Sequence, residues 1–134
     1  MQELVKAAAL AREYAYGPYS RFKVGAAVLG GSGRVYTGCN IENASYGLTI
    51  CAERAAIFKA ISEGEKELVA LAVVADTQQP ASPCGACRQV MVEFGVETVV
   101  LGNLKGEQMV CKLDKLLPYS FTKQAFKGDE ALDE

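Results

Sequence analysis

The chain has 134 residues, a formal net charge of −2 and a hydrophobic share of 50%. This length suits a single domain with a substantial core, residues 1–134, whose acidic tail at about 128–134 we expect to be frayed. The near-balanced charge gives no sign of a nucleic-acid-binding surface, and no apolar run is long enough to span a bilayer. The first residues lack the regions of a signal peptide, and we therefore expect a cytoplasmic protein.

The spacing of apolar residues predicts three helices and five strands. In chain order, these are a helix over 3–16, strands over 23–29 and 34–39, a helix over 51–63, a strand over 68–75, a helix over 83–94, and strands over 98–101 and 108–111. Gly17-Pro18 ends the first helix, and a glycine-rich turn makes the first two strands a hairpin.

From residue 34 onward strands and helices alternate, and we expect each helix to be a right-handed crossover between parallel strands. The run over 68–75 is apolar without alternation, which is typical of a central strand covered on both faces. We therefore predict an α/β fold in three layers, α/β/α, around a mixed, mostly parallel five-stranded sheet.

Two cysteines three positions apart, Cys84 and Cys87, mark a candidate metal site. Ser82 is predicted to be the N-cap of a helix and Pro83 its first residue, so that both thiols lie near the positive end of the helix dipole. This position favours thiolates and suits zinc. Two ligands are not enough, because structural zinc takes four protein ligands and catalytic zinc takes three and an open position.

Cys51 is the best third ligand, because it begins the preceding predicted helix. Helices that follow neighbouring parallel strands start at the same edge of a sheet, so we expect the two helix starts to face each other. Glu53 then lies beside the fourth position. Cys39 or Cys111 could instead close a four-cysteine structural site, although we expect both to be small buried side chains on strands. The chain has no histidine, which leaves carboxylates, cysteines or metal-bound water for acid–base chemistry near neutral pH.

Three stretches of the chain carry a family resemblance: Cys51-Ala52-Glu53-Arg54-Ala55-Ala56, Pro83-Cys84-Gly85-Ala86-Cys87 and Gly38-Cys39-Asn40-Ile41-Glu42-Asn43-Ala44. Together they resemble the zinc-dependent cytidine deaminases, in the small-subunit form with three cysteine ligands. The resemblance runs from about Leu4 to Phe121. It implies a cytidine deaminase-like fold, one Zn²⁺ per subunit and a homotetramer. The implied activity is that of a pyrimidine-salvage hydrolase, which converts cytidine and deoxycytidine to uridine and deoxyuridine and releases ammonia.

The resemblance also implies how the reaction proceeds. Zinc-bound hydroxide attacks C4 of the base, while Glu53 shuttles protons from the water to N3 and to the departing amine. Three thiolates and one zinc ion carry a net charge of −1, which weakens the activation of water. We expect Arg54 to donate hydrogen bonds to the sulfurs and restore it.

Asn40 and Glu42 lie two positions apart in an extended segment, so their side chains point the same way and suit ribose hydroxyls. By resemblance, they bind the 3′-hydroxyl side of the sugar. The remaining substrate contacts that the resemblance implies are Phe22 as an apolar wall, the N–H of Ala52 and the carbonyl of Ser82 at the base edge, Ala44 and Tyr46 near the 5′-hydroxyl across a subunit interface, and Phe121 over the pyrimidine ring of a neighbour's site.

Three other functions compete with this one. Asn40 and Glu42 argue against a deaminase of another cytosine nucleoside, such as a blasticidin-type antibiotic, because they imply a ribose requirement. The mild negative charge argues against deamination of a base in DNA or RNA. A closed site of four thiolates would instead indicate a non-catalytic, zinc-stabilised binding module. We expect a small nucleoside as the substrate and neither nucleic acid nor membrane as a partner.

Overall fold

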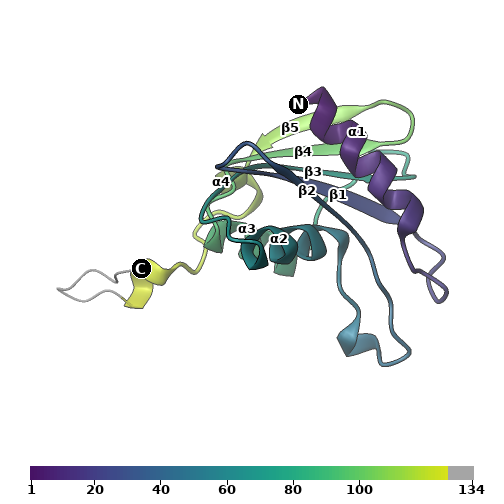
Figure 1. Ribbon diagram of the computed structural model, residues 1–134, viewed down its shortest axis with the longest axis horizontal. Coiled ribbons are helices and arrows are strands. Elements are labelled where there is room, and N and C mark those ends of the chain that lie inside the picture. The colour runs from purple at the N-terminus through teal and green to yellow at the C-terminus, as the bar shows by residue number, and fades with distance from the viewer. Residues whose placement is uncertain (127–134) are drawn as a thin grey trace.

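The computed structural model describes residues 1–126 and contains one five-stranded sheet (Figure 1). The frayed tail expected at 128–134 lies outside the described residues. The strands follow the order β2-β1-β3-β4-β5 across the sheet. Their bounds are Val24–Gly30 for β1, Val35–Cys39 for β2, Leu68–Ala75 for β3, Thr98–Asn103 for β4 and Gln108–Lys112 for β5.

The sheet is mixed, as predicted, but most of its pairings are antiparallel. β1 runs antiparallel to both β2 and β3, and β4 runs antiparallel to β5, whereas β3 and β4 pair in parallel. The expectation of a mostly parallel sheet is wrong because the hairpin strand β1 lies between β2 and β3. The connection from β2 to β3 still joins two strands of the same direction, but they are not neighbours.

Helices cover both faces of the sheet, which confirms the three-layer architecture (Figure 1). α1, Gln2–Ala11, packs on one face, and α2, Ala52–Ser62, and α3, Gly85–Glu93, pack on the other. α1 is shorter than the predicted helix over 3–16, because the chain tightens into a 3₁₀ turn at Arg12–Tyr14. A short helix that the sequence analysis did not predict, α4 at Leu113–Leu116, follows β5.

The central strand β3 contributes to a core on each of its faces. Because successive side chains of a strand alternate, Leu71 and Val73 pack with α2 and α3, while Ala70, Ala72 and Val74 pack against α1. None of the five is more than 1% exposed. The prediction that this run forms a central strand covered on both faces is confirmed.

A glycine on β2 lets α2 lie very close to the sheet. A Cβ added at Gly38 would lie 2.5 Å from the backbone nitrogen of Ala56 and 2.8 Å from the carbonyl oxygen of Ala52. Both atoms belong to the backbone of α2, so residue 38 has no room for a side chain. Since Cys51 and Glu53 lie at the start of this helix, Gly38 helps to set where the candidate site begins.

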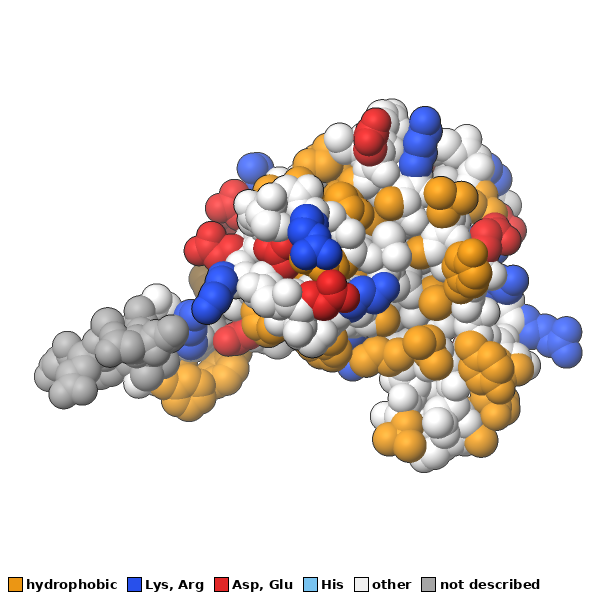
Figure 2. Space-filling view, in the orientation of Figure 1, with side chains coloured by type: hydrophobic (Ala, Val, Ile, Leu, Met, Phe, Trp, Pro, Cys, Tyr) orange, Lys and Arg blue, Asp and Glu red, His pale blue; other side chains and the backbone are white. Residues whose placement is uncertain are grey.

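Two segments project from the body of the molecule and carry exposed apolar side chains (Figures 1 and 2). One is the loop that contains the 3₁₀ turn Tyr46–Leu48, where Tyr46 is 76% exposed. The other is the segment after α4, where Phe121 is 62% exposed and packs edge-on against Phe126. None of the helices described within residues 1–126 is long and apolar enough to cross a membrane.

Candidate metal centre and substrate site

The three cysteines expected to bind zinc lie together at the starts of α2 and α3. Cys51 Sγ is 3.9 Å from Cys84 Sγ, which is 3.5 Å from Cys87 Sγ, and all three sulfurs lie within 4.8 Å of one another. A zinc ion that binds sulfurs tetrahedrally at about 2.3 Å would hold them about 3.8 Å apart. The donor set and its spacing therefore fit zinc. Cys39 and Cys111 are not part of the group, so the four-cysteine alternative is wrong.

Two of these cysteines occupy the N-cap positions of their helices. Cys51 caps α2 and Cys84 caps α3, both with extended backbones, at ψ 155° and 167°. Neither side chain bonds to the backbone of its helix, so both thiols remain available as ligands. Cys87 lies in the first turn of α3 and is fully buried. All three sulfurs are therefore close to the positive end of a helix dipole, which stabilises negative charge.

The N-cap of α3 is Cys84, so the predictions that Ser82 caps this helix and that Pro83 is its first residue are wrong. Arg88 explains the difference. Its guanidinium donates hydrogen bonds to the Pro83 carbonyl at 2.9 Å and to Ser82 Oγ at 2.8 Å, and these contacts hold both residues outside the helix. A third bond, to the Leu116 carbonyl at 2.6 Å, ties the same loop to α4.

Hydrogen bonding prepares the cysteine cluster for a cation. Bonds from the Cys87 thiol and from Arg54, whose Nη2 lies 3.2 Å from Cys51 Sγ, lower the pKa of Cys51 to about 5. The pKa of Cys87 is raised, because it donates to Cys51 and is buried. A divalent cation can replace the remaining thiol protons. The guanidinium of Arg54 then offsets the net negative charge of the cation and its three thiolates.

Glu53 is a buried carboxyl two residues after the first cysteine. It is 4% exposed, and removal from water raises its pKa to about 7, with the negative charge of Cys51 adding to the effect and Arg54 opposing it. A carboxyl that titrates near neutrality can both accept and release a proton at physiological pH. It can therefore serve a chain that has no histidine as its acid and base.

A short backbone ladder joins the expected substrate segment to the metal centre. Ile41 exchanges two hydrogen bonds of 3.0 Å with Ile50, which immediately precedes Cys51. On its other side, Ile41 pairs with Tyr16. These bonds therefore fix the residues that flank Ile41 in space relative to Cys51, the first of the three clustered cysteines.

Asn40 and Glu42 flank Ile41, and their side chains lie on the same side of the segment. A Cβ added at Gly17 would meet Asn40 Nδ2 at 3.4 Å and Glu42 Oε2 at 3.5 Å. Asn40 Nδ2 also donates to the Phe22 carbonyl at 2.9 Å, and its Oδ1 accepts from the N–H of Val24 at 2.8 Å. The structure thus brings together three of the residues expected to contact the nucleoside: Phe22, Asn40 and Glu42.

The other expected substrate residues fall into two groups. Ala52 is the first residue of α2, so its N–H has no partner within the helix, and Ser82 lies in the loop before Cys84. Ala44, Tyr46 and Phe121 instead lie on the two projecting segments and are exposed (Figure 1). The structure therefore does not pack these three into a common pocket with the cysteines.

Sequence analysis missed three residues that organise the site: Tyr19, Ser20 and Arg88. Tyr19 and Ser20 donate hydrogen bonds to Glu42, which lies more than twenty positions further along the chain. No periodicity or spacing links residues so far apart. Arg88 follows Cys87 directly, and its position beside a predicted metal ligand was the only available signal.

Comparisons with known proteins agree with this geometry. Residues 1–103 match the family model of the cytidine and deoxycytidylate deaminase zinc-binding region. The chain is 58% identical to a cytidine deaminase of Halalkalibacterium halodurans over 125 residues, which cover 92% of this chain and 95% of that one. Its structure is similar to the crystal structure of cytidine deaminase from Burkholderia pseudomallei, with a TM-score of 0.86, 52% identity and coverage of 90% and 98%. The cytidine deaminase of Mycobacterium tuberculosis gives a TM-score of 0.77, 45% identity and coverage of 90% and 95%.

Proposed function

Since this chain is an enzyme of the cytidine and deoxycytidylate deaminase zinc-binding family, we propose that it hydrolyses cytidine and deoxycytidine to uridine and deoxyuridine, with release of ammonia. One observation carries the proposal: three clustered cysteine sulfurs, without a fourth, lie at the helix start that holds the buried Glu53. A catalytic zinc takes three protein ligands and keeps its fourth position open for water or substrate.

A bound zinc ion supplies a water that is activated as a nucleophile at neutral pH. Glu53 takes a proton from the attacking water and passes it to N3 of the pyrimidine while C4 becomes tetrahedral. Glu53 then takes the remaining proton from the new C4 hydroxyl and delivers it to the departing amine, which leaves as ammonia while C4 becomes a carbonyl, so one water is consumed for each ammonia released. The raised pKa of Glu53 suits both directions of proton transfer. Arg54 stabilises the thiolate of Cys51.

The nucleoside is bound at both of its ends. Asn40 and Glu42 take the 3′-hydroxyl side of the sugar, and Phe22, which Asn40 holds by its carbonyl, provides an apolar wall. The free N–H of Ala52 and the carbonyl of Ser82 take the edge of the base. The ladder between Ile41 and Ile50 keeps the sugar contacts and the first metal ligand in register.

We further propose a homotetramer in which neighbouring subunits complete one another's sites. The support is the exposure of Tyr46 and Phe121 on projecting segments. In the proposed assembly, Tyr46 and Ala44 reach the 5′-hydroxyl side of a nucleoside in a neighbouring subunit, and Phe121 covers the pyrimidine ring of a neighbour's site. Light scattering should give four times the chain mass of 14.3 kDa. A fully active monomer would contradict this assembly.

The whole chain is proposed to be one domain that acts in cytoplasmic pyrimidine salvage. Two core clusters cover the two faces of a single sheet, which supports one folding unit. All five cysteines are free thiols, as proteins of reducing compartments usually keep them.

The test is the loss of ultraviolet absorbance when the pure protein is mixed with cytidine, run beside cytosine, CMP and adenosine. We expect cytidine to react and the zinc content to be one per chain. Removal of the metal with a chelator should abolish the reaction, and added zinc should restore it. If only cytosine or only adenosine reacts, the proposed substrate is wrong, and a protein without zinc would refute the metal centre.

A further inference from the structure

The turn that precedes Phe22 wraps around the carboxylate of Glu42. Glu42 Oε1 accepts hydrogen bonds from the backbone N–H groups of Tyr19 at 2.9 Å and of Ser20 at 3.1 Å, and Oε2 accepts one from the Ser20 hydroxyl. A carboxylate offers about four acceptor positions. Three are used by these donors, so the turn leaves one acceptor position of Glu42, on Oε2, for a ligand.

The hydroxyl of Ser20 also holds the aromatic residue of the site. Ser20 Oγ accepts a hydrogen bond from the backbone N–H of Phe22 at 3.1 Å. The carbonyl of Phe22 is in turn bound by Asn40 Nδ2. One hydroxyl group therefore connects Glu42 to Phe22, and it sets where the carboxylate stands relative to the apolar wall.

The backbone between these two contacts is strained. Arg21, which lies between Ser20 and Phe22, has a φ of 59°, in the left-handed region that residues other than glycine enter infrequently. Such conformations persist where surrounding contacts enforce them. Here the N–H of Arg21 donates to the Gly17 carbonyl at 2.9 Å. The Ser20 hydroxyl spans Arg21, because it accepts from the N–H of Phe22 and donates to Glu42.

We propose that Ser20 is a positioning residue for sugar recognition: it aims the remaining acceptor of Glu42 at the 3′-hydroxyl of the nucleoside. The inference rests on the proposed function, in which Glu42 binds this hydroxyl. Without the Ser20 hydroxyl, Glu42 keeps its charge and its two backbone donors but is free to rotate at Oε2. Binding of substrates that carry a 3′-hydroxyl then weakens, while the chemistry at Glu53 proceeds as before.

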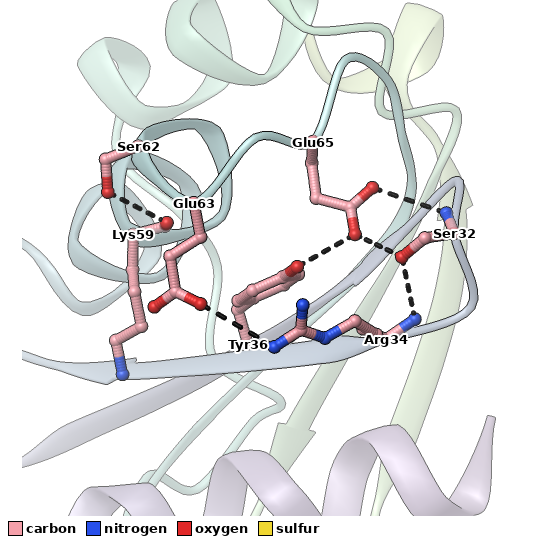
Figure 3. Close-up of polar contacts among 7 residues, drawn as sticks. All are labelled: Ser32, Arg34, Tyr36, Lys59, Ser62, Glu63 and Glu65. Atoms are coloured by element: carbon pink, nitrogen blue, oxygen red, sulfur yellow. Dashed lines mark hydrogen bonds and ion pairs between the residues drawn. The ribbon is translucent and has the colours of Figure 1, made fainter.

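The chain contains a second serine–glutamate contact of the same construction, which provides a matched control (Figure 3). Glu65 Oε1 accepts from the N–H of Ser32 at 3.3 Å, Glu65 Oε2 accepts from the Ser32 hydroxyl, and Ser32 Oγ accepts from the N–H of Arg34 at 3.3 Å. Tyr36 adds one further bond to this carboxylate, at 2.9 Å. This cluster joins the turn between β1 and β2 to the loop after α2 and includes no residue assigned to the substrate.

The experiment compares Ser20→Ala, Ser20→Thr and Ser32→Ala with the wild type on cytidine and on 3′-deoxycytidine. We expect Ser20→Ala to raise KM for cytidine about tenfold, the effect of one hydrogen bond to a charged group, with kcat changed less than about twofold. KM for 3′-deoxycytidine should change little. Ser20→Thr, which keeps the hydroxyl, should recover most of the loss, and Ser32→Ala should leave both substrates unaffected.

The outcomes separate this inference from the proposed function. The positioning role is refuted if Ser20→Ala raises KM equally for both nucleosides, or if it raises KM for cytidine no more than Ser32→Ala does. The proposed function stands in either case, because the wild type remains active. A wild type that deaminates neither nucleoside refutes the proposed function, and the inference fails with it.

Discussion

Replacing Gly38 by alanine tests how the close seat of α2 on the sheet controls the site. The new Cβ would lie 2.5 Å from the nitrogen of Ala56, 2.8 Å from the oxygen of Ala52 and 2.9 Å from the Cβ of Ala55. Non-bonded contacts between such atoms are favourable only at separations of about 3.5 Å or more. Because helix backbone cannot rotate away, the first turns of α2 must move by roughly 1 Å. We expect a cost of about 1–3 kcal/mol, or a fall in Tm of about 4–12 °C.

The same movement should reduce activity, because Cys51 and Glu53 begin this helix. A displacement of about 1 Å at reacting groups can cost about 100-fold in rate. The assay is kcat/KM for cytidine, with zinc content and Tm measured on the same samples. Gly31→Ala is the control: its Cβ would lie 3.4 Å from the Glu67 carbonyl, an ordinary contact, in the turn that joins β2 to β1. A Gly38→Ala variant with the Tm and activity of this control would refute the reasoning.

Three further predictions concern charge. Glu53→Gln should keep zinc and fold but lose about 10²–10⁴-fold in kcat, and near-normal turnover would exclude the proton-transfer role. In the metal-free protein, Cys87 and Arg54 lower the pKa of Cys51 to about 5. Arg54→Gln should therefore raise the pKa of Cys51, which can be followed by measuring thiolate absorbance against pH. A titration that does not shift in this variant would contradict the contact between Arg54 and Cys51. The hydroxyl groups of Ser32 and Tyr36 in Figure 3 lower the pKa of Glu65. The ionised carboxylate therefore stabilises the fold at pH values above the pKa of Glu65 in the unfolded chain, and this stabilisation is lost as the pH falls through the lowered pKa of the folded state. Urea unfolding should therefore separate wild type from Glu65→Gln at about pH 7 and much less at about pH 3, and an equal gap at both would be the opposite result.

Much of the fold could be predicted from local pattern. The run over 68–75 coincides with β3, because eight consecutive apolar residues have few alternatives to a strand buried on both faces. Strand order could not be predicted in the same way. The hairpin at 30–33 determines that β1 and β2 are neighbours, but nothing local says that β1 rather than β2 pairs with β3.

The clustering of Cys51, Cys84 and Cys87 could be predicted because cysteines are rare and their spacing is constrained by helix geometry. The start of α3 could not, since Ser82 and Pro83 are good first residues for a helix until the side chain of Arg88 binds them from the following turn. The surroundings of Glu42 depend in the same way on a turn distant in sequence. Contacts of this kind exist only once the chain has folded.

The pair of hydrogen bonds between Ile41 and Ile50 closes the projecting loop at its root. Residues 43–49 therefore leave the body and return to it at fixed points, and the tip contributes nothing to the spacing between Glu42 and Cys51. Insertions or deletions there are expected to change the surface that the loop presents without altering the spacing between Glu42 and Cys51. The length of the loop can therefore vary to suit a neighbouring molecule while Glu42 and Cys51 keep their places relative to each other.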